Sequence, residues 1–280
     1  MHIPPFDNKN EAIIDIHDAY VPLTYFNVVK LEKGQVFSYQ IPGYETCIVP
    51  ATGCIDVNVD NTGFGGVGNR GSDVWDGEPE GVYVPTDMPA QMVCTSDSCE
   101  VFVAGARFDD RLTPFTVRKN EIDVVQYGSD DTKTHRKIKH ILGQKQADKV
   151  GRLLVSELYT VGAGGWSGFP PHKHDTDRLP NETRHDEVYN FRFKPSHGFG
   201  LQLLEPDAGS LGEAFQIVEG SSFAIKSGYH PCVVAPGYEM YYFTILGGLS
   251  QRSLVQYFQP EHAWQLETIP GIKDMIAKFK

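Results

Sequence analysis

The chain has 280 residues, of which 40% are hydrophobic, and its formal net charge at pH 7 is −11. This apolar content is enough for a buried core in one large domain or in two of ordinary size, which excludes global disorder. The acidic excess argues against a nucleic-acid partner and an anionic membrane surface, and the absence of a run of 18 apolar residues argues against a transmembrane helix.

The cysteines indicate the compartment. There are five, an odd number, and none has Cys-x-x-Cys spacing, which fits a reducing, cytoplasmic location with free thiols. Cys94 and Cys99 flank a turn-like tetrapeptide, and a disulfide between them is the weaker alternative to two buried thiols. The residues after Met1 lack a basic region followed by an apolar stretch, so we expect no secretory signal.

Residues 21 to 106 have the composition of a β-domain. Short segments rich in β-branched and aromatic residues alternate with Gly and Pro, which is typical of a sandwich or barrel. The expected strands are 28–31, 35–39, 46–49, 54–59, 81–84 and 100–104. The glycine-rich stretch 63–71 resembles a phosphate-binding loop but does not open a helix in a βαβ unit, so we interpret it as a flexible loop.

Residues 107 to 149 are more charged, and we interpret them as the connection between two domains. The stretch 136–142 is the only helix-like segment in this region. A basic cluster is interpreted as a solvated face rather than a ligand site. Its members are Lys133, Arg136, Lys137, Lys139 and Lys145.

The second half again predicts strands, and a helical signal follows at 272–279. The expected strands are 152–159, 187–193, 199–204, 215–218, 223–226, 232–234 and 240–246. The two halves look like copies of one unit. Without a gap, 82–86 aligns with 223–227 and 100–104 aligns with 241–245, which places Pro89 at the position of His230.

This repeat predicts an all-β, internally duplicated barrel architecture. The expected divisions are a first barrel at 1–106, a linker at 107–149, and a second barrel with a C-terminal tail at 150–280. No histidine lies between Asp18 and Thr134, so the first copy should be structural and free of metal.

Histidines in the second copy have the spacing of metal ligands. His172 and His174 are separated by one residue, so on a strand both side chains point the same way. His230, in a Gly-Tyr-His-Pro turn before another strand, supplies a third imidazole. Three nitrogens and a carboxylate suit one divalent ion, with Zn²⁺ first and Mn²⁺, Fe²⁺ or Ni²⁺ as competitors. The other histidines considered are interpreted as surface or hydrogen-bonded core residues: His2, His17, His140, His197 and His262.

Several carboxylates compete for the fourth position: Asp175, Asp177, Glu182, Asp186 and Glu187. The first three fall in a polar, Pro-containing stretch that is interpreted as a loop. Glu187 opens the next strand, and parity places it with Tyr189, Phe191 and Phe193 on the barrel interior, which makes it the preferred ligand and Asp186 the alternative. The residues expected to face outward are Val188, Asn190, Arg192 and Lys194.

The combined motifs resemble those of the 5-deoxy-glucuronate isomerase family, two-cupin enzymes of inositol catabolism that are related to the 4-deoxy-5-keto-uronate ketol-isomerases. The motifs are the run from Gly165 to Asp175, Glu187-Val188-Tyr189, the run from Gly198 to Gln202, Gly228-Tyr229-His230-Pro231, Tyr241-Tyr242 and Glu261-His262-Ala263-Trp264. The resemblance implies a bicupin fold and the aldose–ketose isomerisation of 5-deoxy-glucuronate to 2-deoxy-5-keto-gluconate. It implies that His172, His174, Glu187 and His230 bind the metal.

This chain departs from the family pattern at three places. Leu203-Leu204-Glu205 follow Gln202 where Arg-Val-Tyr is usual, Lys226-Ser227 stand where a Pro is usual, and Thr244 replaces an Asn. The metal set is untouched, whereas the substrate stays open: another deoxy-keto-uronate or a related sugar acid is an alternative.

Isomerisation requires a polarised carbonyl and a proton relay. Besides Glu187, parity points Tyr189, Gln202 and Tyr242 into the barrel as candidate catalytic residues. The two tyrosines fit equally well as buried polar residues, whereas an amide facing an apolar lumen favours a function for Gln202. For the substrate carboxylate, Arg184 and Lys173 are the available candidates, although Lys173 should face away from the metal.

Two other functions are compatible with these residues. Three histidines and a glutamate also occur in iron cupins, so a metal-dependent dioxygenase is the first alternative. A non-catalytic cupin that binds a sugar acid is the second. In each case the partner is a small molecule, and a homo-oligomer formed through β-surfaces is compatible with the sequence.

Overall fold

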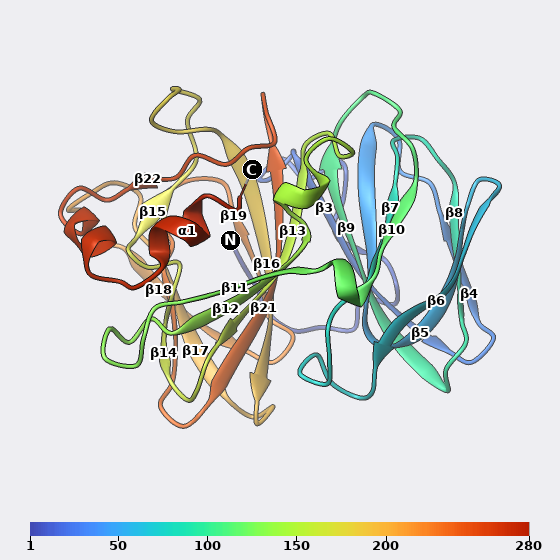
Figure 1. The fold of residues 1–280 in the computed structure, drawn as a ribbon, viewed down its shortest axis with the longest axis horizontal. Coiled ribbons are helices and arrows are strands. Elements are labelled where there is room, and N and C mark those ends of the chain that lie inside the picture. The colour runs from blue at the N-terminus through green and yellow to red at the C-terminus, as the bar shows by residue number, and fades with distance from the viewer. Residues whose placement is uncertain (280) are drawn as a thin grey trace.

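The computed structural model describes residues 1–279, in which two β-rich halves lie side by side (Figure 1). Within these residues the helices are short: three 3-10 helices, η1 (Lys119–Glu121), η2 (Gln144–Gln146) and η3 (Ala263–Glu267), and one α-helix, α1 (Ile272–Ile276). The nearly all-β class is therefore confirmed, as is the helical signal near the C-terminus.

The first half contains two sheets that share one long strand. Its strands are β2 (Ala12–Ile14), β3 (Thr24–Glu32), β4 (Val36–Tyr39), β5 (Tyr44–Val59), β6 (Thr62–Arg70), β7 (Gly81–Val84), β8 (Ala90–Cys94), β9 (Ser98–Arg107) and β10 (Phe115–Val117). One sheet runs β10-β7-β5-β9-β3-β2 and the other β4-β8-β5-β6. Toward the end of β5, Ile55 and Val57 are buried while Asp56 and Asn58 are exposed, the alternation expected when one face of a sheet covers a core.

The second half contains a seven-stranded sheet, a four-stranded sheet and a two-stranded ladder. Its strands are β1 (His2–Ile3), β11 (Asp123–Tyr127), β12 (Arg136–Leu142), β13 (Leu153–Thr160), β14 (Gly165–Ser167), β15 (His172–Lys173), β16 (His185–Lys194), β17 (Phe199–Leu204), β18 (Glu213–Val218), β19 (Ser222–Ile225), β20 (Cys232–Val234), β21 (Glu239–Gly248) and β22 (Tyr257–Phe258). The sheet orders are β1-β19-β16-β21-β13-β12-β11, β14-β20-β17-β18 and β15-β22.

The two halves share one strand order. The order β7-β5-β9-β3 in the first half corresponds to β19-β16-β21-β13 in the second, and β4-β8-β5-β6 corresponds to β14-β20-β17-β18. The ungapped alignment of the sequence matches the same strands, β7 with β19 and β9 with β21. The topology therefore supports the internal repeat.

The prediction of a helix at 136–142 is wrong, because this segment is strand β12 between β11 and β13. Local composition could not reveal a pairing that depends on β13, a strand more than ten residues further along the chain. The interpretation of the basic cluster as a solvated face is wrong for two of its members, because Arg136 is 0% exposed and Lys139 is 3% exposed. Both cations are bonded inside the structure: Arg136 Nε–H donates to the Tyr159 carbonyl, and Lys139 Nζ donates to the Gly77 carbonyl at 2.8 Å.

The interpretation of 63–71 as a flexible loop is also wrong. Residues Thr62–Arg70 form β6, which pairs antiparallel with β5. The ladder has register shifts, and Gly66 and Gly68 adopt φ angles of 59° and 99°, which glycine tolerates better than other residues. The glycines thus allow an irregular strand rather than a loop.

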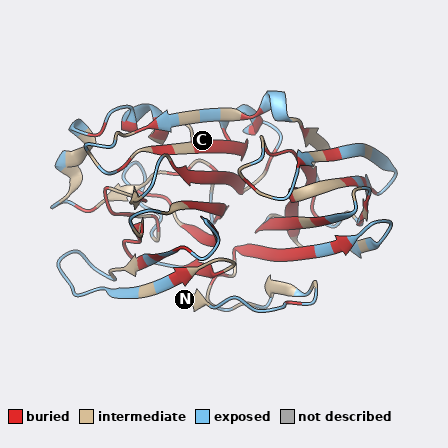
Figure 2. Ribbon diagram, turned by 90° about the horizontal axis from the view of Figure 1, so that it is seen from below, coloured by how far each residue is buried: buried red, intermediate tan, exposed pale blue. Residues whose placement is uncertain are grey.

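The two large sheets pack against each other through an apolar cluster that contains residues of both halves. The rings of Phe102 and Phe243 lie 4.6 Å apart at its centre. Val188 belongs to this cluster and Arg192 donates to Glu100 at 2.6 Å, so the outward face predicted for this strand of the second barrel is largely covered by the first half. Figure 2 shows that the buried segments are concentrated in the strands and the exposed ones in the connecting loops.

A buried ion pair also joins the halves. The guanidinium of Arg70, at the end of β6, donates two hydrogen bonds to the carboxylate of Glu157 on β13. Tyr159 and Tyr241 each donate a hydroxyl to the same carboxylate at 2.9 Å. Because both charges are almost fully buried, the pair specifies how the sheets dock, whereas its net stabilisation is small compared with the loss expected if one partner were removed.

Some strands cross the predicted domain boundaries. Strand β1 pairs with β19 in the second half, and β11 and β12, from the predicted linker, extend the sheet of the second half. The division at 106 and 149 stays a prediction. The five cysteines are free, and none of the helices in residues 1–279 is long and apolar enough to span a membrane.

Burial makes the protein sensitive to acid at His140. Its Nδ1 lies 2.8 Å from the Ser156 hydroxyl and its ring lies 4.8 Å from that of Phe279, and burial lowers the pKa of His140 to about 4. The unfolded chain, whose histidine titrates near 6.5, therefore binds this proton first as the pH falls. Stability present at neutral pH should be lost between roughly pH 6.5 and pH 4, by about 3 kcal/mol for this group.

Urea unfolding at pH 7 and pH 4.5 would test this expectation with the wild type and His140→Gln. The wild type should lose about 2–3 kcal/mol more stability between these pH values than the variant, whose side chain does not titrate. Equal losses in the two proteins would contradict the assignment.

Candidate metal centre

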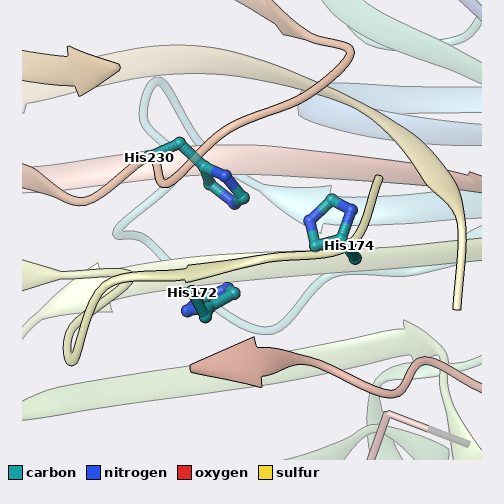
Figure 3. Close-up of side chains that lie close together, drawn as sticks. All are labelled: His172, His174 and His230. Atoms are coloured by element: carbon teal, nitrogen blue, oxygen red, sulfur yellow. The ribbon is translucent and has the colours of Figure 1, made fainter. Parts of the chain in front are cut away.

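Three imidazoles converge in the second half of the chain. His172 lies in β15, His174 follows directly after it, and His230 lies in the turn before β20. One nitrogen from each lies within 4.8 Å of the other two, and the side chains are buried. The rings face a common space (Figure 3). The structure therefore brings together the three histidines that the sequence selected.

Glu187 brings a carboxylate to the same space. Its Oε2 lies 3.0 Å from Nε2 of His174 and 3.3 Å from Nε2 of His230. The neighbouring Asp186 points the other way, because its Oδ2 accepts the backbone N–H of Leu23 in the first half at 3.0 Å. The geometry thus offers three nitrogens and one oxygen in the combination expected from parity.

Backbone carbonyls orient the three rings. Nδ1–H of His172 donates to the Pro170 carbonyl at 3.3 Å, and that of His174 donates to the His185 carbonyl at 3.0 Å. Nδ1–H of His230 donates to the Gly228 carbonyl at 2.8 Å. With Nδ1 held by a carbonyl, Nε2 is the nitrogen that each ring directs into the shared space, as in metal sites where the second ring nitrogen is held by a carbonyl.

The titration of these groups depends on their mutual contacts. Burial, together with the neighbouring His230 and His174, lowers the pKa of His172 to about 3. Burial alone would lower the pKa of His174, but its hydrogen bond and charge interaction with Glu187 outweigh burial and raise it. Burial would raise the pKa of Glu187, but the hydrogen bond with His174 and the nearby His230 outweigh burial and lower it. The centre thus keeps one carboxylate ionised among three rings.

Two other acidic residues hold the ligand loops together. Glu182 accepts hydrogen bonds from the backbone N–H of Asp175 and Thr176 and from Lys173 Nζ. Asp175 accepts from the Gly228 N–H at 3.0 Å and also from Lys173, so it connects the strand of His172 to the turn of His230. Both acids are candidate ligands by their sequence, but no local pattern indicates this structural role.

The candidate catalytic residues are placed differently from one another. Tyr189 lies beside the centre: burial and then the nearby Glu187 raise its pKa well above 10. The amide of Gln202 donates to the His230 carbonyl at 2.8 Å and therefore supports the ligand turn from behind. The hydroxyl of Tyr242 is hydrogen-bonded to Ser167, and its ring lies 4.6 Å from that of Tyr189.

A narrow cavity reaches the centre, and its lining includes His172, His174, Glu187, Tyr189, Tyr242, Thr244 and Gln256. The C-terminal segment closes part of it, since Leu254, Met275 and Phe279 also line the wall. Strand β22 attaches this segment by pairing with β15. The helical signal at 272–279 was predicted, but no sequence pattern indicated that this segment covers the site.

Neither residue considered for a substrate carboxylate lies in this cavity. Lys173 is bound to Asp175 and Glu182, on the outside of the ligand loop. Arg184 lies near Asp186, with 3.7 Å between the charged atoms. The described residues that line the cavity include no lysine or arginine. Its wall is therefore built for hydroxyls and apolar groups, with the charge concentrated at the histidine–glutamate centre.

Comparison with known proteins identifies the family. The family model described as KduI/IolB matches residues 2–265. The chain belongs to this family. It is 30% identical over 256 residues to the 5-deoxy-glucuronate isomerase of Listeria monocytogenes serotype 4a (strain HCC23), covering 90% of this chain and 92% of that protein. It is 32% identical over 263 residues to the protein of the same name from Bacillus subtilis (strain 168), covering 93% and 94%.

Solved structures agree with this assignment. An IolB-like protein from Salmonella typhimurium LT2 superimposes with a TM-score of 0.85 at 28% identity, covering 94% of this chain and 98% of that one. A Lactobacillus farciminis oxalate decarboxylase gives a TM-score of 0.62 at 11% identity, covering 90% and 83%. This second likeness concerns the fold alone, and it relates the KduI/IolB chain to cupin-fold proteins.

The bridging role of Asp175 can be tested by metal binding. Replacing Asp175 with Asn weakens the link between the ligand loops, so we expect divalent-metal affinity to fall roughly 10- to 100-fold, as for other residues that support metal ligands. Competition with a chelating dye measures this affinity. Asp177→Asn is the matched control, because Asp177 lies in the same loop but accepts the Arg184 N–H, and it should stay within a few-fold of wild type. Equal effects of both variants would contradict the role of Asp175.

Proposed function

We propose that this chain is a metal-dependent aldose–ketose isomerase that converts 5-deoxy-glucuronate to 2-deoxy-5-keto-gluconate in inositol catabolism. The observation that carries the proposal is the convergence of three histidine Nε2 atoms and the Glu187 carboxylate at the end of a cavity. We assign the substrate from relatives in the KduI/IolB family, which are named 5-deoxy-glucuronate isomerases.

The residues present fit a divalent metal. His230 Nε2 has no hydrogen-bond partner in the described structure although it is buried, and all three rings are oriented with Nε2 inward. His172, His174, His230 and Glu187 would hold the ion, and this donor set suits Zn²⁺ first, then Mn²⁺, Fe²⁺ or Ni²⁺. When bound, the ion would supply Lewis acidity that polarises the substrate carbonyl.

Around that centre, the protein's own groups would control protons. Isomerisation removes a proton from the carbon next to the aldehyde, returns a proton to the aldehyde carbon, and moves a hydroxyl proton between the two oxygens. Since the pKa of Tyr189 is raised well above 10, its hydroxyl stays neutral and can donate to the oxygen on which negative charge develops. Apolar wall residues exclude water from this exchange.

The remaining candidates have positioning roles in this scheme. Gln202 holds the His230 turn through the peptide carbonyl and thereby orients a ligand rather than the substrate. The ring of Tyr242 forms part of the cavity wall, and its hydroxyl is hydrogen-bonded to Ser167. Tyr189 is therefore the preferred proton donor among the three.

We extend the proposal to the architecture. Each half would be a cupin barrel, the first at 1–106 without ligands and the second at 150–280 with them, joined through 107–149. Two observations support this division of roles. The halves share one strand order, and the repeat aligns Pro89 of the first half with His230 of the second. The five free cysteines fit a cytoplasmic enzyme.

Metal analysis coupled to a proton NMR assay with 5-deoxy-glucuronate tests the function. The wild type should bind about one equivalent of metal per chain and form the keto acid only with metal present. His172→Ala should lose both properties, with turnover reduced by at least about 100-fold because one ligand of the Lewis-acid site is missing. His197→Ala, which removes an exposed histidine in the turn between β16 and β17, is the control and should retain both.

Other outcomes separate the alternatives. Oxygen consumption in place of keto-acid formation would replace the isomerase with a dioxygenase. Binding of the acid without turnover, with metal restored, would indicate a sugar-acid-binding protein. A wild type without stoichiometric metal would contradict the proposal at its centre.

A further inference from the structure

Two polar side chains in the cavity wall have hydrogen-bonding atoms without partners. They are the hydroxyl of Thr244 and the side-chain oxygen of Gln256. Both residues line the cavity that contains His172, His174 and Glu187. Buried polar atoms are usually satisfied, so two unsatisfied atoms in one cavity suggest that something absent from the free protein binds there.

Thr244 is the more deeply buried of the two. It lies on β21, where it pairs in register with Tyr189 of β16, and parity points it into the barrel with Tyr242 and Leu246. Its residue is 2% exposed, and its hydroxyl donates to no neighbour. Leaving a buried hydroxyl unsatisfied is destabilising, so packing alone would be better served by valine, which has the same shape.

Thr160 shows how the same fold satisfies a threonine that has a structural role. Thr160 is also 2% exposed and lies on the adjacent strand β13. Its hydroxyl accepts the Met240 N–H at 2.8 Å and donates to the Met240 carbonyl at 3.4 Å. The missing partners of Thr244 are therefore a feature of its site and not of buried threonines in this barrel.

Gln256 approaches the centre from the C-terminal segment, one residue before β22. Its amide N–H donates to Nε2 of His172 at 2.8 Å, while its side-chain oxygen has no partner. That Nε2 is the atom His172 would use as a ligand, because Nδ1–H is already held by the Pro170 carbonyl. If His172 Nε2 binds a metal ion, it no longer accepts the hydrogen bond from Gln256. The amide nitrogen and the amide oxygen of Gln256 can then both bond to a molecule in the cavity.

We propose that Thr244 and Gln256 are substrate-binding residues that recognise hydroxyl groups of the sugar acid. This inference rests on the proposed function for the class of ligand. A hydroxyl both donates and accepts, and so do the threonine hydroxyl and the two ends of the glutamine amide, which makes them complementary. The described lining of the cavity includes no lysine or arginine that could pair with the substrate carboxylate. We therefore place the substrate hydroxyls, and not its carboxylate, beside Thr244 and Gln256.

Calorimetry on the metal-loaded protein tests Thr244. The probe is the alcohol made by reducing the aldehyde of 5-deoxy-glucuronate, which keeps the hydroxyls but cannot isomerise. Thr244→Val should bind this probe roughly 3- to 10-fold more weakly, the effect of one lost hydrogen bond. Its metal content should be unchanged and its thermal midpoint equal or higher, since the unsatisfied hydroxyl is gone. The control Thr160→Val should show the reverse: a lower midpoint and unchanged affinity.

Gln256→Met distinguishes recognition from support of the histidine. If Gln256 binds substrate, the variant should lose affinity for the probe by a similar factor while its metal affinity is equal or higher, because the competing bond to His172 is removed. Reduced metal affinity with unchanged probe binding would show that Gln256 only orients His172, and would overturn its assignment.

The binding assay also separates this inference from the reaction. A wild type that binds the alcohol but does not convert 5-deoxy-glucuronate would contradict the proposed reaction, while weaker binding by both variants would still support the two recognition residues. Unchanged probe affinity in Thr244→Val, or no binding by the wild type, would overturn the inference.

Discussion

The structure depends on holding three imidazole nitrogens and one carboxylate together away from water. Such groups lose hydration on burial, and the contacts between Glu187 and two of the histidines compensate for only part of that loss. Most of the surrounding polar structure restrains these four side chains. Backbone carbonyls fix each ring, Asp175 and Glu182 tie the loops together, and Gln202 supports the turn of His230. A divalent ion would satisfy the Nε2 atom of His230, which these contacts leave without a hydrogen-bond partner.

The candidate metal ligands lie in only one copy of the internal repeat. The first half has the strand order of the second, but it lacks histidine from position 18 to 134 and has Pro89 where the second half has His230. Its main contact surface is the sheet face packed through Phe102 against Phe243. The buried pair of Arg70 and Glu157 specifies that docking, since a shifted arrangement would leave an uncompensated charge in the interior. The sheet that carries Glu187 thus packs against the first half on the face opposite the cavity.

The sequence pointed to the four central residues by two signals: strand parity for His172, His174 and Glu187, and the Gly-Tyr-His-Pro turn for His230. It placed Glu187 and Tyr189 inside the barrel by parity, and it chose Glu187 over Asp186, which the structure directs toward Leu23. It failed where the outcome depends on distant partners. Segment 136–142 forms a strand because β11 and β13 pair with it, and β6 forms despite its glycines because β5 extends beside it.

Other features had no local signal at all. The carbonyls that orient the three rings are determined by tertiary geometry, as is the position of the C-terminal segment over the cavity. Gln256 is an ordinary glutamine in the sequence, and only its approach to His172 reveals a role. Thr244 can be interpreted as one more β-branched strand residue until its burial and its lack of a partner are seen.

Anomalous diffraction at the zinc edge, from crystals grown with Zn²⁺, tests the central claim most directly. The account predicts one strong peak about 2.0–2.2 Å from Nε2 of His172, His174 and His230 and from a carboxylate oxygen of Glu187. A peak elsewhere in the molecule, or a peak at the histidines with Glu187 turned away, would contradict the four-residue centre on which the account rests.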